Sequence, residues 1–168
     1  MKKFTIILAV LLLTACTTNT SLMQITSSAF DHEGEIPSKY TCDNENVNPP
    51  LDIGQVPEDA ESLALIVDDP DAPAGTWVHW LMWNIDPAQT RIIENSVPKG
   101  ITEGTTSFGE QGYGGPCPPS GSHRYFFKLY ALDTKLDLKP DADKAALESA
   151  MKGHIIEQTE LMGTYSRN

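Results

Sequence analysis

The fold and the candidate site both centre on the stretch Asp68-Asp69-Pro70-Asp71-Ala72-Pro73, which a short loop joins to Trp77-Val78-His79-Trp80-Leu81-Met82-Trp83. The apolar run Leu63 to Val67 precedes the carboxylates, so three acidic side chains stand where a buried strand is expected to end. Pro70 and Pro73 remove backbone donors and keep the residues before them out of the helical region. This predicts a stiff, extended loop.

The run that begins at Trp77 has the composition of a β-strand, in which side chains alternate between two faces. A strict period of two places Trp77, His79, Leu81 and Trp83 on one face, and Val78, Trp80 and Met82 on the other. A histidine between tryptophans and close to a carboxylate cluster is a candidate polar site with aromatic walls. On this stretch alone, a core histidine that hydrogen-bonds to a neighbour is the simpler interpretation.

The first residues resemble a bacterial lipoprotein signal. Lys2-Lys3 precedes a ten-residue apolar run, Phe4 to Leu13, which is too short to span a bilayer and ends in Leu13-Thr14-Ala15-Cys16. We expect residues 1–15 to be a signal peptide, Cys16 to be lipidated, 16–22 to be a tether and 23–168 to form one domain. The expected location is the bacterial cell envelope, with the protein facing the periplasm or the exterior. The alternative is an ordinary signal peptide cut near Ala15.

The charge balance excludes one class of partner. The formal net charge of −11 becomes −13 without residues 1–15, which contain two lysines and no acid. Such a chain repels the phosphate backbone, so we expect no nucleic-acid partner. It also disfavours adsorption on anionic lipid, so any attachment to a membrane is expected to come from acyl chains at the N-terminus.

Two cysteines remain if Cys16 is lipidated. Cys42 and Cys117 are expected to form a disulfide in an exported protein, and the alternative is two separate thiols. Closing so long a loop corresponds to roughly 4 kcal/mol in the chain-entropy model. Neither cysteine has a second one at the spacing of a structural zinc site, so no metal and no cofactor is predicted.

The rest of the chain predicts mainly strands. The expected strands are 62–68, 77–85, 91–93, 123–132 and 159–166, and one helix is expected from Asp141 to about Ile156. His123 and Tyr125 share a face at the start of their strand. The glycine- and proline-rich segment 109–121 precedes them; it either lets a ligand approach backbone amides or is a plain surface loop.

Taken together, these motifs resemble the phosphatidylethanolamine-binding protein family, in its bacterial branch related to Raf kinase inhibitor protein. The resemblance covers about residues 23–167. It rests on Asp69-Pro70-Asp71-Ala72-Pro73, Trp77 with His79, Gly114-Gly115-Pro116-Cys117-Pro118-Pro119 and His123-Arg124-Tyr125. It implies a mainly β fold of the β-rich α+β class, in which a large central antiparallel sheet packs with a smaller sheet and few peripheral helices.

The resemblance also implies a small anion-accepting pocket at the ends of the strands. Its ligand-binding residues would be Asp69, Asp71, Trp77, His79, Gly114, Gly115, His123 and Tyr125. Imidazolium groups, glycine amides and a tyrosine hydroxyl donate hydrogen bonds, whereas an ionised aspartate only accepts them. This set suits a monoprotonated phosphomonoester or a zwitterionic head group such as phosphoethanolamine, whose ammonium could donate to Asp69.

Three functions compete on the sequence. Binding of a small anion or phospholipid head group is favoured, and inhibition of a kinase or protease follows by analogy alone. Val78 stands where eukaryotic relatives often carry a first histidine, and the chain ends at Asn168, near where their C-terminal helix begins, which weakens the kinase analogy. Catalysis comes third, because no serine or cysteine nucleophile motif accompanies the histidines. A metal site of His79 and His123 with Asp69 or Asp71 is a variant of that third class.

Overall fold

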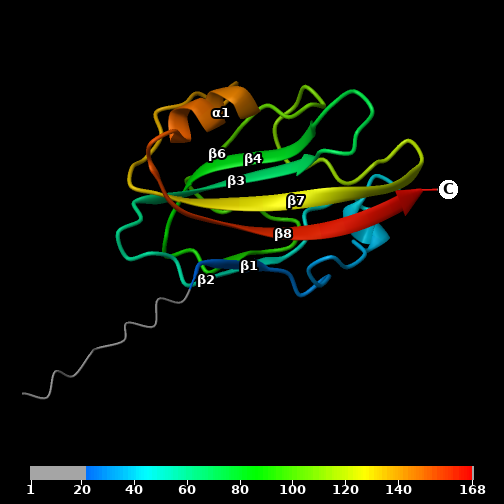
Figure 1. Cartoon of the computed structure of the whole chain (residues 1–168), viewed down its shortest axis with the longest axis horizontal. Helices are drawn as coiled ribbons and strands as arrows, with labels where there is room; N and C mark the ends of the chain where they lie inside the picture. The colour runs from blue at the N-terminus through cyan, green and yellow to red at the C-terminus, as the bar shows by residue number, and fades with distance from the viewer. Residues whose placement is uncertain (1–21, 168) are drawn as a thin grey trace, which may run out of the picture.

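The computed structural model describes residues 22–167, so the expected signal peptide, the lipidation site Cys16 and most of the tether lie outside the described residues. Within these residues, two antiparallel sheets and one α-helix make up the fold, which confirms the expected mainly β class (Figure 1). The larger sheet has the strand order β6-β4-β3-β7-β8 and the smaller one β1-β2-β5. The elements are β1 (Gln24–Thr26), the 3-10 helix η1 (Ser38–Tyr40), β2 (Leu51–Gly54), β3 (Ser62–Asp69), β4 (Trp77–Ile85), β5 (Arg91–Ile92), β6 (Thr102–Glu103), β7 (Gly121–Leu132), α1 (Lys144–Met151) and β8 (Ile155–Arg167).

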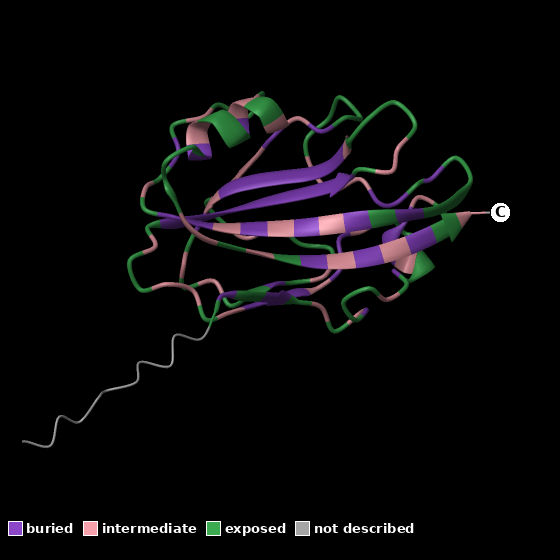
Figure 2. Ribbon diagram, viewed as in Figure 1, coloured by how far each residue is buried: buried purple, intermediate pink, exposed green. Residues whose placement is uncertain are grey.

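The central strands of the large sheet are covered on both faces. Figure 2 shows β3 and β4 buried along nearly their whole length, whereas β7 and β8 alternate between buried and exposed residues. This explains why the sequence of β3 is a continuous apolar run and that of β7 an alternating one.

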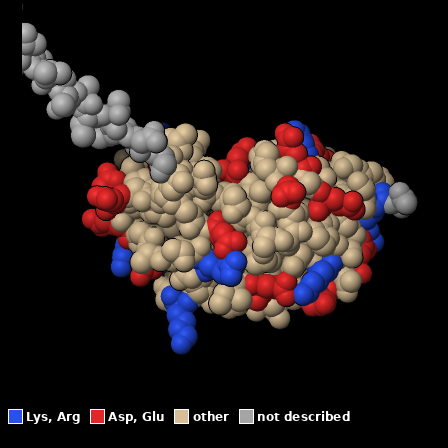
Figure 3. All heavy atoms as spheres, turned by 90° about the horizontal axis from the view of Figure 1, so that it is seen from below, with Lys and Arg blue, Asp and Glu red and all other residues tan. Residues whose placement is uncertain are grey.

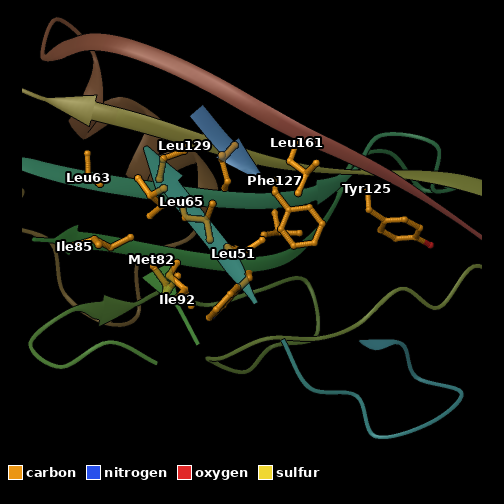
Figure 4. Close-up of a cluster of buried hydrophobic side chains, with 14 of the residues drawn as sticks. Leu51, Leu63, Leu65, Met82, Ile85, Ile92, Tyr125, Phe127, Leu129 and Leu161 are labelled. Atoms are coloured by element: carbon orange, nitrogen blue, oxygen red, sulfur yellow. The ribbon is translucent and has the colours of Figure 1, made fainter. Parts of the chain in front are cut away.

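A hydrophobic core fills the space between the two sheets. It joins Leu51 of β2 and Ile92 of β5 to Leu65, Phe127 and Leu161 of the large sheet (Figure 4). A second cluster on the opposite face packs α1 against the sheet through Leu147 and Met151. The large sheet is therefore the middle layer, between the small sheet on one side and α1 on the other (Figure 1).

A β-bulge at His79 corrects the expected faces of β4. Val78 pairs with Asp68, but Trp80 pairs with Val67, so His79 is the extra residue on β4. Beyond this bulge the alternation is inverted. Trp80 and Met82 therefore lie in the core between the sheets, and Val78, Leu81 and Trp83 face α1. The predicted sets, with Trp77 and His79 on the same face as Leu81 and Trp83, were wrong.

The helix is shorter than predicted. It begins after Asp143, whose carboxylate accepts a hydrogen bond of 2.9 Å from the amide of Ala146, and it ends at Met151. Gly153 then has φ +86, which stops the helix, and Ile155 already belongs to β8. His154 is consequently not on a helical face but pairs with Asp133 at the surface.

The face shown in Figure 3 has no continuous basic patch, because acidic and basic side chains are interspersed on it. Within residues 22–167, no helix has the length and apolarity needed to cross a membrane.

Candidate functional site

The site residues meet because neighbouring strands of the large sheet are antiparallel. Asp69 is the last residue of β3, Trp77 the first of β4, and His123 lies near the start of β7. β3 pairs with both β4 and β7, so these three ends lie at the same edge of the sheet. Strand direction thus gathers Asp69, Trp77 and His123, and the bulge residue His79 lies two residues after Trp77.

His123 is held by Asp69. Its Nδ1 lies 2.7 Å from Oδ2 of Asp69, and the two side chains are only 9% and 4% exposed. The other oxygen, Oδ1, accepts a hydrogen bond of 2.8 Å from the amide of Asp71. Because a carboxylate only accepts, Nδ1 of His123 carries the proton. Asp69 therefore fixes the tautomer of His123.

His79 is held by the backbone of the glycine-rich loop. Its Nδ1 donates to the carbonyl oxygen of Gly114 at 2.6 Å, and a carbonyl oxygen only accepts, so this ring also carries its proton on Nδ1. The ring packs edge-on against Phe108 and Tyr125, with centroids 5.5 and 5.2 Å away. Burial lowers the pKa of His79 below its usual value, and the Gly114 hydrogen bond and the Asp69 charge offset this only in part.

A cavity of about 400 Å³ opens over these groups. Asp69, His79 and His123 are the only ionisable side chains that line it. Within residues 22–167, the hydrogen bonds of both histidines use Nδ1, and neither Nε2 has a hydrogen-bond partner. The remaining walls are apolar or small. They are Ala72, Pro73, Ala74, Trp77, Phe108, Cys117, Pro118 and Pro119.

Gly114 and Gly115 play a different part from the one predicted. Their amides donate to the carbonyl of His79 at 2.9 Å and to Oδ1 of Asn46 at 2.8 Å, so they are not free for a ligand. The two glycines line a neighbouring cavity instead of this one. A Cβ on Gly115 would lie 2.5 Å from the carbonyl oxygen of Tyr40, which explains the need for glycine there. The expectation that these amides meet the anion was wrong; Gly114 holds the backbone and ring of His79, and Gly115 is bonded to Asn46.

Tyr125 and Asp71 also support the site from outside the cavity. Tyr125 is fully buried beneath the His79 ring, and its hydroxyl points away from the core cluster (Figure 4). Burial raises its pKa. Asp71 forms two hydrogen bonds with the Arg124 guanidinium, at 2.9 and 2.7 Å, which lower its pKa to about 2. Neither side chain lines the cavity, so neither offers the ligand contact predicted for it.

Phe108 was missed by the sequence analysis. It lies in a loop between β6 and β7, is 46% exposed, and packs edge-on against Trp77 with a centroid distance of 5.5 Å. A single aromatic residue in an irregular segment has no periodic signal, and only the position of its loop over β4 shows its role. The amide of Ser107 donates to the carbonyl of Val78, which places the loop there.

The predicted disulfide is present. Cys42 and Cys117 are joined with Cα atoms 5.5 Å apart, which links the segment after η1 to the wall of the cavity. Among residues 22–167, no group of three or more His, Cys, Asp or Glu side chains is arranged to hold a metal ion.

Comparison with known proteins agrees with this fold. The family model described as phosphatidylethanolamine-binding protein matches residues 26–166. A UPF0098 protein of Methanothermobacter thermautotrophicus is 51% identical over 150 residues, which cover 86% of this chain and 99% of that protein. Another UPF0098 protein, from Chlamydia muridarum, is 43% identical over 151 residues, covering 87% of this chain and all (100%) of that one.

Solved structures give the same result. The homologue CT736 of Chlamydia trachomatis superposes with a TM-score of 0.84 at 43% identity, covering 88% of this chain and 99% of that chain. YbcL of E. coli, described as a member of the mammalian family, has a TM-score of 0.83 at 29% identity, covering 88% and 100%. The chain therefore belongs to the phosphatidylethanolamine-binding protein family.

Proposed function

We propose that this protein binds a small anion, the phosphate group of a phosphorylated ligand, in the cavity over His79 and His123. One observation carries the proposal. In each of two buried histidines, Nδ1 donates a hydrogen bond to an acceptor of the protein. Two Nε2 atoms therefore remain as hydrogen-bonding groups for a ligand, in a cavity whose walls beyond Asp69 are mostly apolar. Protonated Nε2 donates a charge-assisted hydrogen bond to an anionic oxygen.

The protonation state sets which form of the anion binds. Neutral Nε2 accepts a hydrogen bond from a protonated oxygen of the anion, whereas protonated Nε2 donates a hydrogen bond to an ionised oxygen. Because burial lowers the pKa of His79, its ring is neutral near pH 7 in the free protein, and a bound anion raises that pKa again. Affinity for a fully ionised anion therefore falls as pH rises between the lower pKa of the free protein and the higher pKa of the complex.

We favour binding over catalysis for this site. The sulfur of Cys117, the one cysteine on the cavity wall, is held in the disulfide and is no nucleophile. Oγ of Ser107 accepts a hydrogen bond of 2.9 Å from the amide of Val78, and Ser107 does not line the cavity. The histidine–aspartate pair thus acts as a fixed binding group.

Replacement of either histidine is expected to weaken anion binding. His79→Gln and His123→Gln should each cost roughly 1.5–3 kcal/mol, the range of a charge-assisted hydrogen bond, which is about a 10- to 150-fold loss of affinity. Calorimetric titration with phosphate, and with sulfate whose charge is constant over the tested range, should be run at pH 5.5 and 7.5. His154→Gln is the control, because His154 is exposed and pairs with Asp133 outside the cavity. Wild-type affinity in both cavity variants would refute the proposal.

We further propose that the protein is a lipoprotein of the cell envelope, anchored through Cys16. The support is the ten-residue apolar run that ends in Leu13-Thr14-Ala15-Cys16. Cys16→Ser is expected to abolish the acyl mass on the mature protein and to release it from the membrane fraction or leave it unprocessed. Mass spectrometry and fractionation measure both effects. An unchanged mature mass and distribution would contradict the assignment.

A further inference from the structure

The cavity is polar only at Asp69, His79 and His123. Trp77, Phe108 and Pro118 contribute apolar surface beside them. Phe108 is 46% exposed, so a ligand above the histidines would cover part of an aromatic ring that water now contacts. Burial of that surface would favour an apolar group over a charged one.

Asp69 offers a cation little accessible surface, and both of its oxygens already accept a hydrogen bond. One oxygen accepts from His123 and the other from the amide of Asp71, and the residue is 3% exposed. Asp71 itself is paired with Arg124 and lies outside the cavity lining. An ammonium group inside this cavity would therefore lose its hydration and could gain only a carboxylate that two protein donors already share, which is unfavourable.

The cavity is also larger than one anion. A water molecule takes about 30 Å³ of the liquid, and the cavity of about 400 Å³ thus has room for several further heavy atoms beyond a phosphate group. The additional room is bounded by the apolar walls. A group attached to the phosphate would therefore contact the aromatic and proline side chains of these walls.

Building on the phosphate binding proposed above, we propose that the site selects phosphate monoesters with an apolar substituent, alkyl or aryl, over the zwitterionic phosphoethanolamine. The phosphate lies at His79 and His123, and the substituent packs against Trp77 and Phe108. This ligand class differs from the head group first expected from the sequence.

Glu110 is the carboxylate that could favour phosphoethanolamine, so its replacement tests that alternative. It lines the neighbouring cavity of about 190 Å³, which shares Phe108 and Cys117 with the first. An ethanolamine group that reached past Phe108 would meet this carboxylate. Glu110→Gln would then weaken phosphoethanolamine binding, whereas our proposal predicts no change.

The experiment compares methyl, butyl and phenyl phosphate with phosphoethanolamine by calorimetry at one pH on the full mature protein. Each buried methylene is expected to raise affinity up to about fourfold, so butyl and phenyl phosphate should bind at least about tenfold more tightly than methyl phosphate. Phosphoethanolamine should bind no more tightly than methyl phosphate. Phe108→Ala should reduce the advantage of butyl phosphate several-fold and leave methyl phosphate unchanged. Phe126→Ala, on the outer face of β7, is the matched control.

Two results would overturn the inference. One is equal affinity for methyl and butyl phosphate, and the other is a preference for phosphoethanolamine that Glu110→Gln removes. Either would leave the phosphate-binding proposal intact, because methyl phosphate would still bind. Failure of all four esters to bind would instead refute the phosphate-binding proposal and this inference with it.

Discussion

The double variant Cys42→Ser/Cys117→Ser is expected to lower the free energy of unfolding by about 4 kcal/mol. The two cysteines are 75 residues apart, and a cross-link over such a loop removes many conformations from the unfolded chain. For a domain of this size, about 2–4 °C per kcal/mol gives a fall in Tm of roughly 8–16 °C. Calorimetry and urea unfolding measure both values.

The reduced wild-type protein is the matched comparison. Treatment with a dithiol reductant should lower its Tm to that of the double variant, and should not change the double variant itself. Some of the link survives reduction, because the amide of Cys42 donates to the carbonyl of Pro116 at 3.1 Å, and Tyr113 donates to the carbonyl of Tyr40 at 2.8 Å. A double variant that unfolds within 2 °C of wild type would show that these contacts suffice.

Much of the fold was predictable from sequence because its signals are local. β3 is a continuous apolar run because both of its faces are covered, and β7 alternates because only one of its faces is fully covered. The convergence of Asp69, His79 and His123 was expected from the resemblance, and antiparallel strand pairing explains it. The disulfide followed from the cysteine count in a chain expected to be exported.

Most of the wrong predictions depend on interactions between segments distant in sequence. A bulge at His79 inverts the faces of β4, and nothing in the local period shows where a bulge falls. The amides of Gly114 and Gly115 were expected to be free, but the carbonyl of His79 and the side chain of Asn46 accept from them. The helix was extended too far because His154 continues the helical spacing of Leu147 and Met151, whereas Gly153 ends the helix and Ile155 pairs with Leu132 in β8.

Asp68, which directly precedes the site residue Asp69, forms a buried pair of salt bridges on the opposite face of the sheet. It is fully buried, and Lys128 Nζ lies 2.8 Å from Oδ1 while Lys144 Nζ lies 2.7 Å from Oδ2. Lys144 is the first residue of α1. Burial lowers the pKa of Lys144, but the hydrogen bond and charge of Asp68 and those of Glu148 together outweigh this, and the net pKa is raised. Asp68 thus connects β3, β7 and α1.

Asp68→Asn is accordingly expected to destabilise the protein by about 3–5 kcal/mol, because it removes the buried counter-charge of two partly buried ammonium groups and leaves Lys144 only the more exposed Glu148, 3.5 Å away. Asp71→Asn is the matched control three residues away; its pair with Arg124 is half exposed and should cost about 1 kcal/mol or less. Urea unfolding compares the two, and hydrogen exchange should show faster opening of α1 only in the Asp68 variant. Equal stabilities would mean that solvent replaces Asp68 as effectively as it replaces Asp71. The expected difference arises because Asp68 is fully buried between the sheet and the helix, whereas the Asp71–Arg124 pair is largely exposed and water replaces it more effectively.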